Sequence, residues 1–364
     1  MRVLLVNEVF GVTSTGGICA RTAEQLEEEG HEVRAAFGRR PEVPERYRRF
    51  AHYFGSGPET AWHGVRTRLF DAHGFGSERA TGKLLRWAEA YGPQLLWLHN
   101  LHGYYIHVGM LFAWIKAHPE MRVQWTLHDC WAFTGHCAHF TAADCRQWKT
   151  RCADCPQLRR YPACRFIGAP GRNFDRKREA FTGVRDLTLI TPSRWLAGLT
   201  RESFLREYPV AVRPNTIDRE VFRPTPGSFR ERYGLRDKTV VLGVANVWDR
   251  RKGLYDFHRL AGLLDGSYAL VLVGVTERQR RALPRNITGI PRTSDPRELA
   301  EIYTAADVFV NPTYEDSYPT VNLEAEACGT RVITYDAGGC GETLRDSRSA
   351  AVPVGAVEEI ARRL

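Results

Sequence analysis

Short apolar runs that end in polar residues recur along the first half of the chain. Each is long enough for a buried strand: residues 2–7, 31–37, 94–99, 123–128 and 187–191. After a loop over residues 8–17, Ile18, Ala23 and Leu26 fall on one face of a predicted helix that ends near Gly30. Alternating strands and helices of this kind predict a parallel sheet with helices packed on its faces.

The same alternation starts again in the second half. Strands are predicted at residues 239–245, 268–274, 308–311 and 331–334, and helices at 296–305 and 320–328. Turn residues join the halves near 210–222, so we expect two domains, 1–212 and 213–364. Residues 39–90 are basic and aromatic and show no clear period; they form either an acceptor-facing insertion or irregular structure.

Polar residues follow several of the predicted strands of the first domain. They are Asn7, the pair His99-Asn100, the pair His128-Asp129 and the segment 191–194. In open parallel sheets, ligands bind beyond the carboxyl ends of the strands. The fold class is therefore α/β, with two Rossmann-like domains expected to face each other across a cleft. Such a cleft suits a ligand with two chemical ends, such as a nucleotide and a sugar.

Composition and charge narrow the class of protein. The 364 residues carry a net charge of +9, and residues 145–185 hold 11 Lys or Arg against 3 Asp or Glu. This excess indicates either a solvated face or an anionic partner. No nucleic-acid motif accompanies the charge, which favours a membrane surface or an anionic acceptor over nucleic acid. No apolar stretch approaches the ~20 residues that span a bilayer, and residues 1–7 do not form a signal peptide, so we expect a cytoplasmic protein.

The most informative block of the sequence lies at residues 316–329. Asp316 and Glu324 are separated by seven residues, and Glu324 falls inside a predicted helix that ends at Gly329. Two carboxylates so placed can accept hydrogen bonds from the hydroxyls of a sugar and a ribose. The alternative is that neither residue has a function, Asp316 being an acidic residue of a loop and Glu324 a glutamate on the surface of a helix.

The start of that helix is predicted to face a ligand. Ser317 or Thr320 can cap it, and Pro319 fits its first turn. Free N–H groups and the positive end of the helix dipole favour a diphosphate at such a position.

Several further motifs occur in the same order as in a known protein family. They are the Gly-Gly loop at 14–17, Leu-His-Asp-Cys-Trp at 127–131, Thr-Pro-Ser-Arg-Trp at 191–195, Pro-Asn-Thr-Ile-Asp at 214–218 and Arg-Lys-Gly at 251–253. With the block at 316–329, the chain resembles the family 4 retaining glycosyltransferases of the GT-B fold, closest to their capsular, exopolysaccharide and colanic-acid branch. The Gly-Gly loop is not GxGxxG, which counts against a dinucleotide oxidoreductase.

The resemblance implies roles for individual residues. Glu324 is expected to hold the ribose of the donor, Asp316 to contact the transferred sugar, Lys252 to neutralise the diphosphate and His128 to lie near the sugar. His128, Asp316 and Lys252 are thus the expected catalytic residues. The expected donor-binding residues are Gly16, Gly17, Asn246, Arg251, Lys252, Asp316, Thr320, Val321 and Glu324.

Two positions depart from the family pattern. Asp316 stands where the family usually has Glu, and Asn246 and Val247 stand where an Arg usually precedes the Lys. Arg250 or Arg251 is then a candidate replacement. The resemblance implies no covalent nucleophile: the acceptor hydroxyl attacks on the face that the phosphate leaves, and a phosphate oxygen takes its proton.

The function expected from these features is retaining transfer of a hexosyl group from a UDP- or GDP-sugar to an acceptor hydroxyl, in polysaccharide or glycoconjugate biosynthesis. A lipid-linked oligosaccharide is the expected acceptor, with contact at the inner membrane face and no nucleic-acid partner. Two alternatives stay open: a nucleotide-sugar epimerase or hydrolase of the same fold, and a non-catalytic nucleotide-sugar-binding protein.

Cysteines cluster in the predicted loop at about 130–165. Four of them, one pair in a Cys-x-x-Cys arrangement, could close a tetrahedral zinc site: Cys137, Cys145, Cys152 and Cys155. His136 and His139 are competing ligands, and free thiols or disulfides are the alternative. A site closed by four thiolates would be structural, and no catalytic metal is expected.

Overall fold

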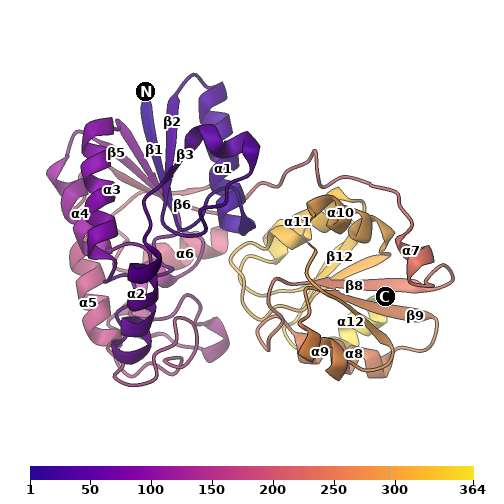
Figure 1. Cartoon of the computed structure of the whole chain (residues 1–364). Coiled ribbons are helices and arrows are strands. Elements are labelled where there is room, and N and C mark those ends of the chain that lie inside the picture. The colour runs from indigo at the N-terminus through magenta and orange to yellow at the C-terminus, as the bar shows by residue number, and fades with distance from the viewer. Residues whose placement is uncertain (294) are drawn as a thin grey trace. The chain divides into compact units, whose positions relative to one another are not determined.

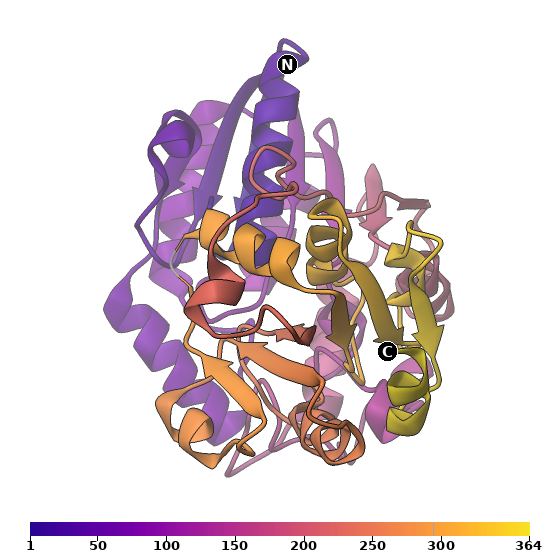
Figure 2. The same ribbon diagram turned by 90° about the vertical axis from the view of Figure 1, so that its right-hand side faces the viewer.

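The computed structural model describes residues 1–293 and 295–364. Its chain divides into two compact units, Met1–Pro214 and Asn215–Leu364. The division falls close to the boundary predicted after residue 212. Each unit holds one parallel sheet covered by helices on both faces (Figures 1 and 2).

The sheet of the first unit has seven strands in the order β3-β2-β1-β4-β5-β6-β7. They are β1 (Arg2–Asn7), β2 (Glu32–Phe37), β3 (Ala51–Tyr53), β4 (Leu95–Leu98), β5 (Arg122–Thr126), β6 (Leu187–Thr191) and β7 (Val210–Val212). The strands expected from the sequence are all present. The two that it did not predict, β3 and β7, have three residues each and lie at the edges of the sheet, too short to show a period.

Helices of the first unit cover both faces of this sheet. They are α1 (Thr13–Glu28), α2 (Gly57–Phe70), α3 (Glu78–Tyr91), α4 (Val108–Ala117), α5 (Pro170–Phe181) and α6 (Arg194–Glu202). One face is packed by a core that includes Phe112, Trp125 and Phe181. The other face is packed by a smaller core that includes Ala23 of α1 and Phe50.

Residues 39–90 consist mostly of regular elements, so of the two alternatives left open for this region, irregular structure is not the one observed. They form a 3₁₀ turn (Glu45–Phe50), β3, α2 and most of α3. The start of α2 has local signals that the overall pattern hid: Ser56 Oγ accepts the N–H of Glu59 at 3.5 Å, and Pro58 lies in the first turn. Whether the region faces an acceptor stays a prediction.

The sheet of the second unit has six strands in the order β10-β9-β8-β11-β12-β13. They are β8 (Thr239–Val244), β9 (Tyr268–Val273), β10 (Ile287–Ile290), β11 (Val308–Asn311), β12 (Arg331–Tyr335) and β13 (Ala350–Val352). The helices are α7 (Phe229–Arg232), α8 (Leu254–Leu263), α9 (Glu277–Ala282), α10 (Pro296–Ala305), α11 (Thr320–Ala327) and α12 (Val357–Arg363). The sequence did not predict β10 and β13, which are again the short edge strands.

Both sheets reverse their strand order in the middle, between β1 and β4 and between β8 and β11. This is the doubly wound, Rossmann-like arrangement, and ligands bind beyond the carboxyl ends of the strands at such a reversal. The prediction of two Rossmann-like α/β domains is confirmed. In the part of the chain that the structure describes, no helix is long and apolar enough to span a bilayer.

Candidate active site

The acidic block of the second unit follows β11, next to the reversal of its sheet. Asp316 lies in the loop, α11 begins at Thr320, and Glu324 is inside the helix. The predicted caps were wrong: Pro319 is at the N-cap position, and no side chain of the described residues caps the helix. Because Thr320 is already helical, its hydroxyl cannot cap, and the buried Ser317 Oγ has no hydrogen-bond partner. Asn322 N donates to the carbonyl of Pro319 at 3.3 Å. Among the described residues, the N–H groups of Thr320 and Val321 are therefore left for an outside acceptor.

Lys252 and Asp316 form an ion pair in this loop. Lys252 Nζ donates to Asp316 Oδ2 at 2.7 Å, and about a fifth of each side chain is exposed (19% and 22%). Asp316 Oδ1 also accepts the N–H of Tyr318 at 3.2 Å. The structure thus brings together two residues that the sequence placed in one site without showing that they touch.

The turn that carries Lys252 is held against the loop before α11. Lys252 N donates to Asp249 Oδ1 at 2.9 Å, and Tyr314 N donates to the carbonyl of Arg251 at 2.8 Å. Gly253 has φ +74°, and a Cβ there would come within 2.3 Å of the carbonyl oxygen of Pro312. Only glycine allows this close approach, so the turn and the loop are fixed relative to each other.

The arginine of the family pattern, which this chain lacks, has a candidate replacement nearby. Arg251 Nη1 donates to the carbonyl of Glu315 at 3.1 Å, which places this cation beside the acidic loop. Asn246, Val247 and Arg250 are exposed on the turn after β8, and Val247 is 65% exposed. Arg251 is therefore better placed than Arg250.

Glu324 has a partner that the sequence reasoning missed. Its Oε2 accepts the hydroxyl of Tyr303, at 3.2 Å, from the neighbouring helix α10. Tyr303 is fully buried, and burial and the adjacent Glu324 raise its pKa well above the usual value. The phenol therefore stays a donor and fixes one carboxylate oxygen. A tyrosine on a separate helix gives no sequence signal for this contact.

A buried amide chain ties α11 to its sheet. Asn311 Nδ2, at the end of β11, donates to Asn322 Oδ1 at 2.8 Å, and Asn322 Nδ2 donates to Thr343 Oγ1 at 2.9 Å. Thr320 and Val321, predicted to bind the donor, are half-buried in the first turn above this chain. A satisfied buried network of this kind holds the helix start in one position.

In the first unit, the polar strand ends meet at the reversal of the sheet. Asn100 N donates to Asn7 Oδ1 at 3.0 Å, linking the ends of β1 and β4. His99 Nδ1 and His128 Nε2 are 3.2 Å apart, linking the ends of β4 and β5. Polar residues that the sequence places after separate strands thus contact one another at one edge of the sheet.

The His99–His128 contact sets the tautomer of His128. His99 is buried, and its Nε2 has no partner. An unpaired buried N–H costs more than an unpaired acceptor, so we assign the proton of His99 to Nδ1, which donates to His128 Nε2. Burial lowers the pKa of His128 from 6.5 to about 4. His128 is therefore neutral at pH 7, with its proton on Nδ1.

The residue after His128 belongs to a second hydrogen-bonded group. Asp129 Oδ2 and His102 Nε2 are 2.7 Å apart, and His102 Nδ1 contacts the hydroxyl of Tyr161 at 3.0 Å. Burial acts to raise the pKa of Asp129, but His102 outweighs it and holds that pKa below its usual range. The ionised Asp129 thus stabilises the loop next to His128 through its contact with His102.

Gly16 and Gly17 are not in a loop, contrary to the sequence prediction. The helix α1 begins at Thr13, so both glycines lie within its first turns. A Cβ on Gly16 would come within 3.0 Å of Val9, which shows why a small residue is needed where the helix passes the preceding loop. Their role in donor binding stays a prediction.

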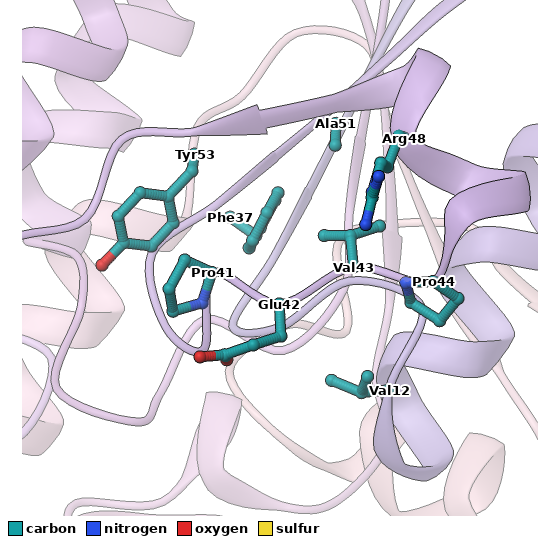
Figure 3. A pocket seen from close by; sticks show the side chains of 9 residues that line it. All are labelled: Val12, Phe37, Pro41, Glu42, Val43, Pro44, Arg48, Ala51 and Tyr53. Atoms are coloured by element: carbon teal, nitrogen blue, oxygen red, sulfur yellow. The ribbon is translucent and has the colours of Figure 1, made fainter.

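An open pocket of about 560 Å³ lies beside the end of β2 (Figure 3). Its walls are mostly apolar, and three polar side chains, Glu42, Arg48 and Tyr53, also line it. None of the residues predicted for the donor lines this pocket. A mixed surface of this kind fits an amphipathic ligand.

The four cysteines of the predicted zinc site line one small cavity, together with His136. His136 Nδ1 contacts Asp71 Oδ1 at 2.6 Å, and its Nε2 is buried without a partner. Within the described residues, however, no three His, Cys, Asp or Glu side chains are grouped so that they could hold a metal ion. The zinc site therefore stays a prediction.

Comparison with known proteins agrees with this geometry. Residues 238–364 match the family described as "Glycosyl transferases group 1". The chain is 26% identical over 307 residues to the putative colanic acid biosynthesis glycosyl transferase WcaC of Escherichia coli K12, covering 78% of this chain and 70% of that protein. It is 28% identical over 318 residues to a D-inositol 3-phosphate glycosyltransferase of Streptomyces bingchenggensis, covering 80% of this chain and 65% of that protein.

Solved structures show the same fold. The sucrose-phosphate synthase of Thermosynechococcus elongatus has a TM-score of 0.70 at 17% identity, covering 100% of this chain and 88% of that one. WaaG, a glycosyltransferase of lipopolysaccharide biosynthesis, has a TM-score of 0.64 at 15% identity, covering 99% and 88%. The whole chain thus has the GT-B fold, and its residues 238–364 match the group 1 glycosyltransferases.

The family match covers the part of the chain that contains Lys252, Asp316 and Glu324. It includes none of the first unit, where His128 and the cysteine cavity lie. The chain spans about two thirds of the length of the curated relatives (70% and 65%).

Proposed function

We propose that this glycosyltransferase moves a hexosyl group, with retention of configuration, from a UDP- or GDP-sugar to an acceptor hydroxyl. The Lys252–Asp316 ion pair in front of the uncapped start of α11 is the observation that carries this proposal. It combines a cation, free N–H groups and a carboxylate at one sheet reversal, which are the groups that a sugar diphosphate needs.

Each group has a chemical part in the proposed reaction. When the bond from the anomeric carbon to the diphosphate breaks, negative charge develops on the leaving oxygen. Lys252 and the first N–H groups of α11 stabilise that charge. Asp316 then accepts hydrogen bonds from the sugar hydroxyls, and Glu324, fixed by Tyr303, accepts them from the ribose.

His128 would act on the sugar as a neutral donor. Its Nε2 is occupied by His99, which leaves Nδ1–H for a sugar hydroxyl. The acceptor hydroxyl forms the new bond to the anomeric carbon on the face that the diphosphate leaves, and a diphosphate oxygen takes the hydroxyl proton. No residue of this chain is required as a covalent nucleophile.

For the acceptor, we propose a lipid-linked oligosaccharide used in polysaccharide or glycoconjugate biosynthesis on the cytoplasmic side of the membrane. The relative WcaC bears a name from colanic acid biosynthesis, and a Campylobacter jejuni relative, 27% identical over 123 residues, is named for an undecaprenol-diphosphate-linked substrate. The pocket of Figure 3, with apolar walls and polar side chains, would receive the sugar end of such an acceptor.

The test is release of nucleoside diphosphate from a panel of UDP- and GDP-sugars, with and without an undecaprenyl-diphosphate-linked glycan. We expect one donor to be consumed, at a rate that rises with acceptor, and NMR to show the anomeric configuration retained in the product. Equal consumption without acceptor would instead identify a hydrolase or epimerase. Donor binding without turnover on any acceptor would identify a non-catalytic binding protein.

We also propose that the cysteine cavity of the first unit binds one structural zinc ion. The four thiols that line one cavity support this proposal, since four thiolates close a tetrahedral zinc site. The proposed ligands are Cys137, Cys145, Cys152 and Cys155.

Metal analysis of chain purified without chelators tests the zinc proposal. We expect one zinc per chain, lost in Cys152→Ser and kept in Cys164→Ser, a buried cysteine that does not line the cavity. A metal-free chain with four titratable thiols, or with a disulfide among them, would overturn the proposal.

A further inference from the structure

The helix α2 of the first unit is amphipathic, but its apolar face is the one exposed to solvent. Its buried residues are His63, Gly64 and Thr67, all small or polar. Its large apolar side chains are instead exposed to solvent: Trp62 by 62%, Val65 by 40%, Leu69 by 40% and Phe70 by 44%. Since Trp62, Val65 and Leu69 follow helical spacing, they share the outer face of the helix.

A loop adds two more exposed apolar side chains beside this face. Arg165 N donates to the carbonyl of Arg68, and Ile167 N donates to that of Leu69, both at 2.8 Å, so this loop runs along the end of α2. Phe166 is 73% exposed and Ile167 53%. We call the combined surface the α2 patch; it consists of Trp62, Val65, Leu69, Phe70, Phe166 and Ile167.

Arginines border the α2 patch. Arg68, Arg165 and Arg172 are exposed, and no carboxylate of the described residues pairs with any of them. The nearby acids are already engaged. Asp71, at the end of α2, is buried and contacts His136 Nδ1 at 2.6 Å. Glu59 accepts the backbone N–H groups of Arg79 and Ala80, and Glu78 pairs with Arg66 at 2.8 Å.

From this arrangement we propose that the α2 patch docks on an anionic lipid surface. Apolar and aromatic side chains can enter the interface between headgroups and acyl chains, while arginines contact lipid phosphates. The excess of positive charge supports an anionic membrane as the partner: residues 145–185 carry 11 basic against 3 acidic residues. A nucleic-acid backbone would satisfy the arginines but leave six apolar side chains in water.

This inference rests on the proposed function in one respect: the α2 patch is the surface at which a lipid-linked acceptor would be met. Vesicle binding needs no donor. The chain can therefore fail to bind vesicles while it still releases nucleoside diphosphate, or bind vesicles without releasing it, and the two measurements distinguish these outcomes.

The test is cosedimentation of the full chain with vesicles of phosphatidylcholine, alone or mixed with phosphatidylglycerol. We expect binding only to the mixed vesicles, weakening as salt increases. Phe166→Ser should weaken it about tenfold, the loss expected from one large apolar side chain. Arg165→Gln should weaken it about fivefold, since a basic residue near an anionic surface contributes about 1 kcal/mol.

Matched controls lie on the second unit. Tyr255→Ser removes an aromatic side chain that is 65% exposed on α8, and Arg285→Gln removes an exposed arginine; both should bind vesicles as the unchanged chain does. Equal binding by Phe166→Ser, or no binding to the mixed vesicles at low salt, would overturn the proposal. So would a chain dimer that Phe166→Ser dissociates, because the patch would then be a protein interface.

Discussion

Replacing Lys252 with alanine removes the ammonium that pairs with Asp316 at 2.7 Å. In the proposed reaction this ammonium faces the charge that develops on the leaving diphosphate. The substitution also takes this positive charge away from the Asp316 carboxylate, whose negative charge then opposes binding of the donor diphosphate. We therefore expect a loss of turnover together with weaker donor binding.

The size of the loss follows from the surroundings of the pair. With each side chain about four-fifths covered, at 19% and 22% exposure, water screens the ammonium only in part. Two unit charges 4 Å apart interact by about 4 kcal/mol at an effective dielectric constant of 20, an upper bound for the net effect. Removing one preorganised donor to developing charge typically lowers kcat by about 10²–10³-fold. We expect kcat of Lys252→Ala to fall within that range.

The assay is steady-state release of nucleoside diphosphate, with thermal unfolding measured in parallel. Lys238→Ala is the matched control, an exposed lysine of the same unit outside the site, and should keep kcat and KM. The double variant Lys252→Ala with Asp316→Ala should lose less than the two single losses added together, since the residues act as a pair. A lower Tm of Lys252→Ala with unchanged kcat and KM would refute the reasoning, because the pair would then be purely structural.

Three further predictions concern the hydrogen bonds and protons of the two units. Tyr303→Phe removes the hydrogen bond to one oxygen of Glu324. Calorimetry should then show nucleoside diphosphate binding weakened about tenfold, with little effect on kcat. Unchanged affinity would contradict the role of Glu324 in holding the ribose. His99→Leu removes the donor to His128, so ¹⁵N NMR should show its single tautomer replaced by a mixture, with a lower kcat; an unchanged tautomer would refute the assignment. Burial lowers the pKa of His63 from 6.5 to about 4, so the unfolded chain binds more protons at this residue between these values, and His63 should contribute about 2 kcal/mol to the fall in the free energy of unfolding from pH 7 to pH 5. His63→Gln should reduce the fall by that amount in urea unfolding, and an equal fall in both proteins would refute the contribution of His63.

Much of the fold could be predicted from the sequence because its signals are local. An apolar run such as residues 308–311 predicts its own strand, and the seven-residue spacing from Asp316 to Glu324 spans a loop and the first turns of a helix. The carboxyl ends of adjacent parallel strands must meet at one edge, which is why His99 and His128 could be expected together. Elements of three residues, such as β3 and β7, are too short for any period and form only because a neighbouring strand offers hydrogen bonds.

The contacts that give the site its chemistry depend on the tertiary structure. Lys252 and Asp316 are 64 residues apart, and Tyr303 reaches Glu324 from another helix. Such pairs arise from the packing of one element on another, which no local pattern encodes. The same holds for α2, whose apolar face local reasoning would bury: the helix instead packs through His63, Gly64 and Thr67 and leaves Trp62 in water. The sequence by itself determined the order of the elements and the types of the functional side chains. Only the tertiary structure decided which of them touch and which surface stays exposed, because both depend on how distant segments share the limited space around each sheet.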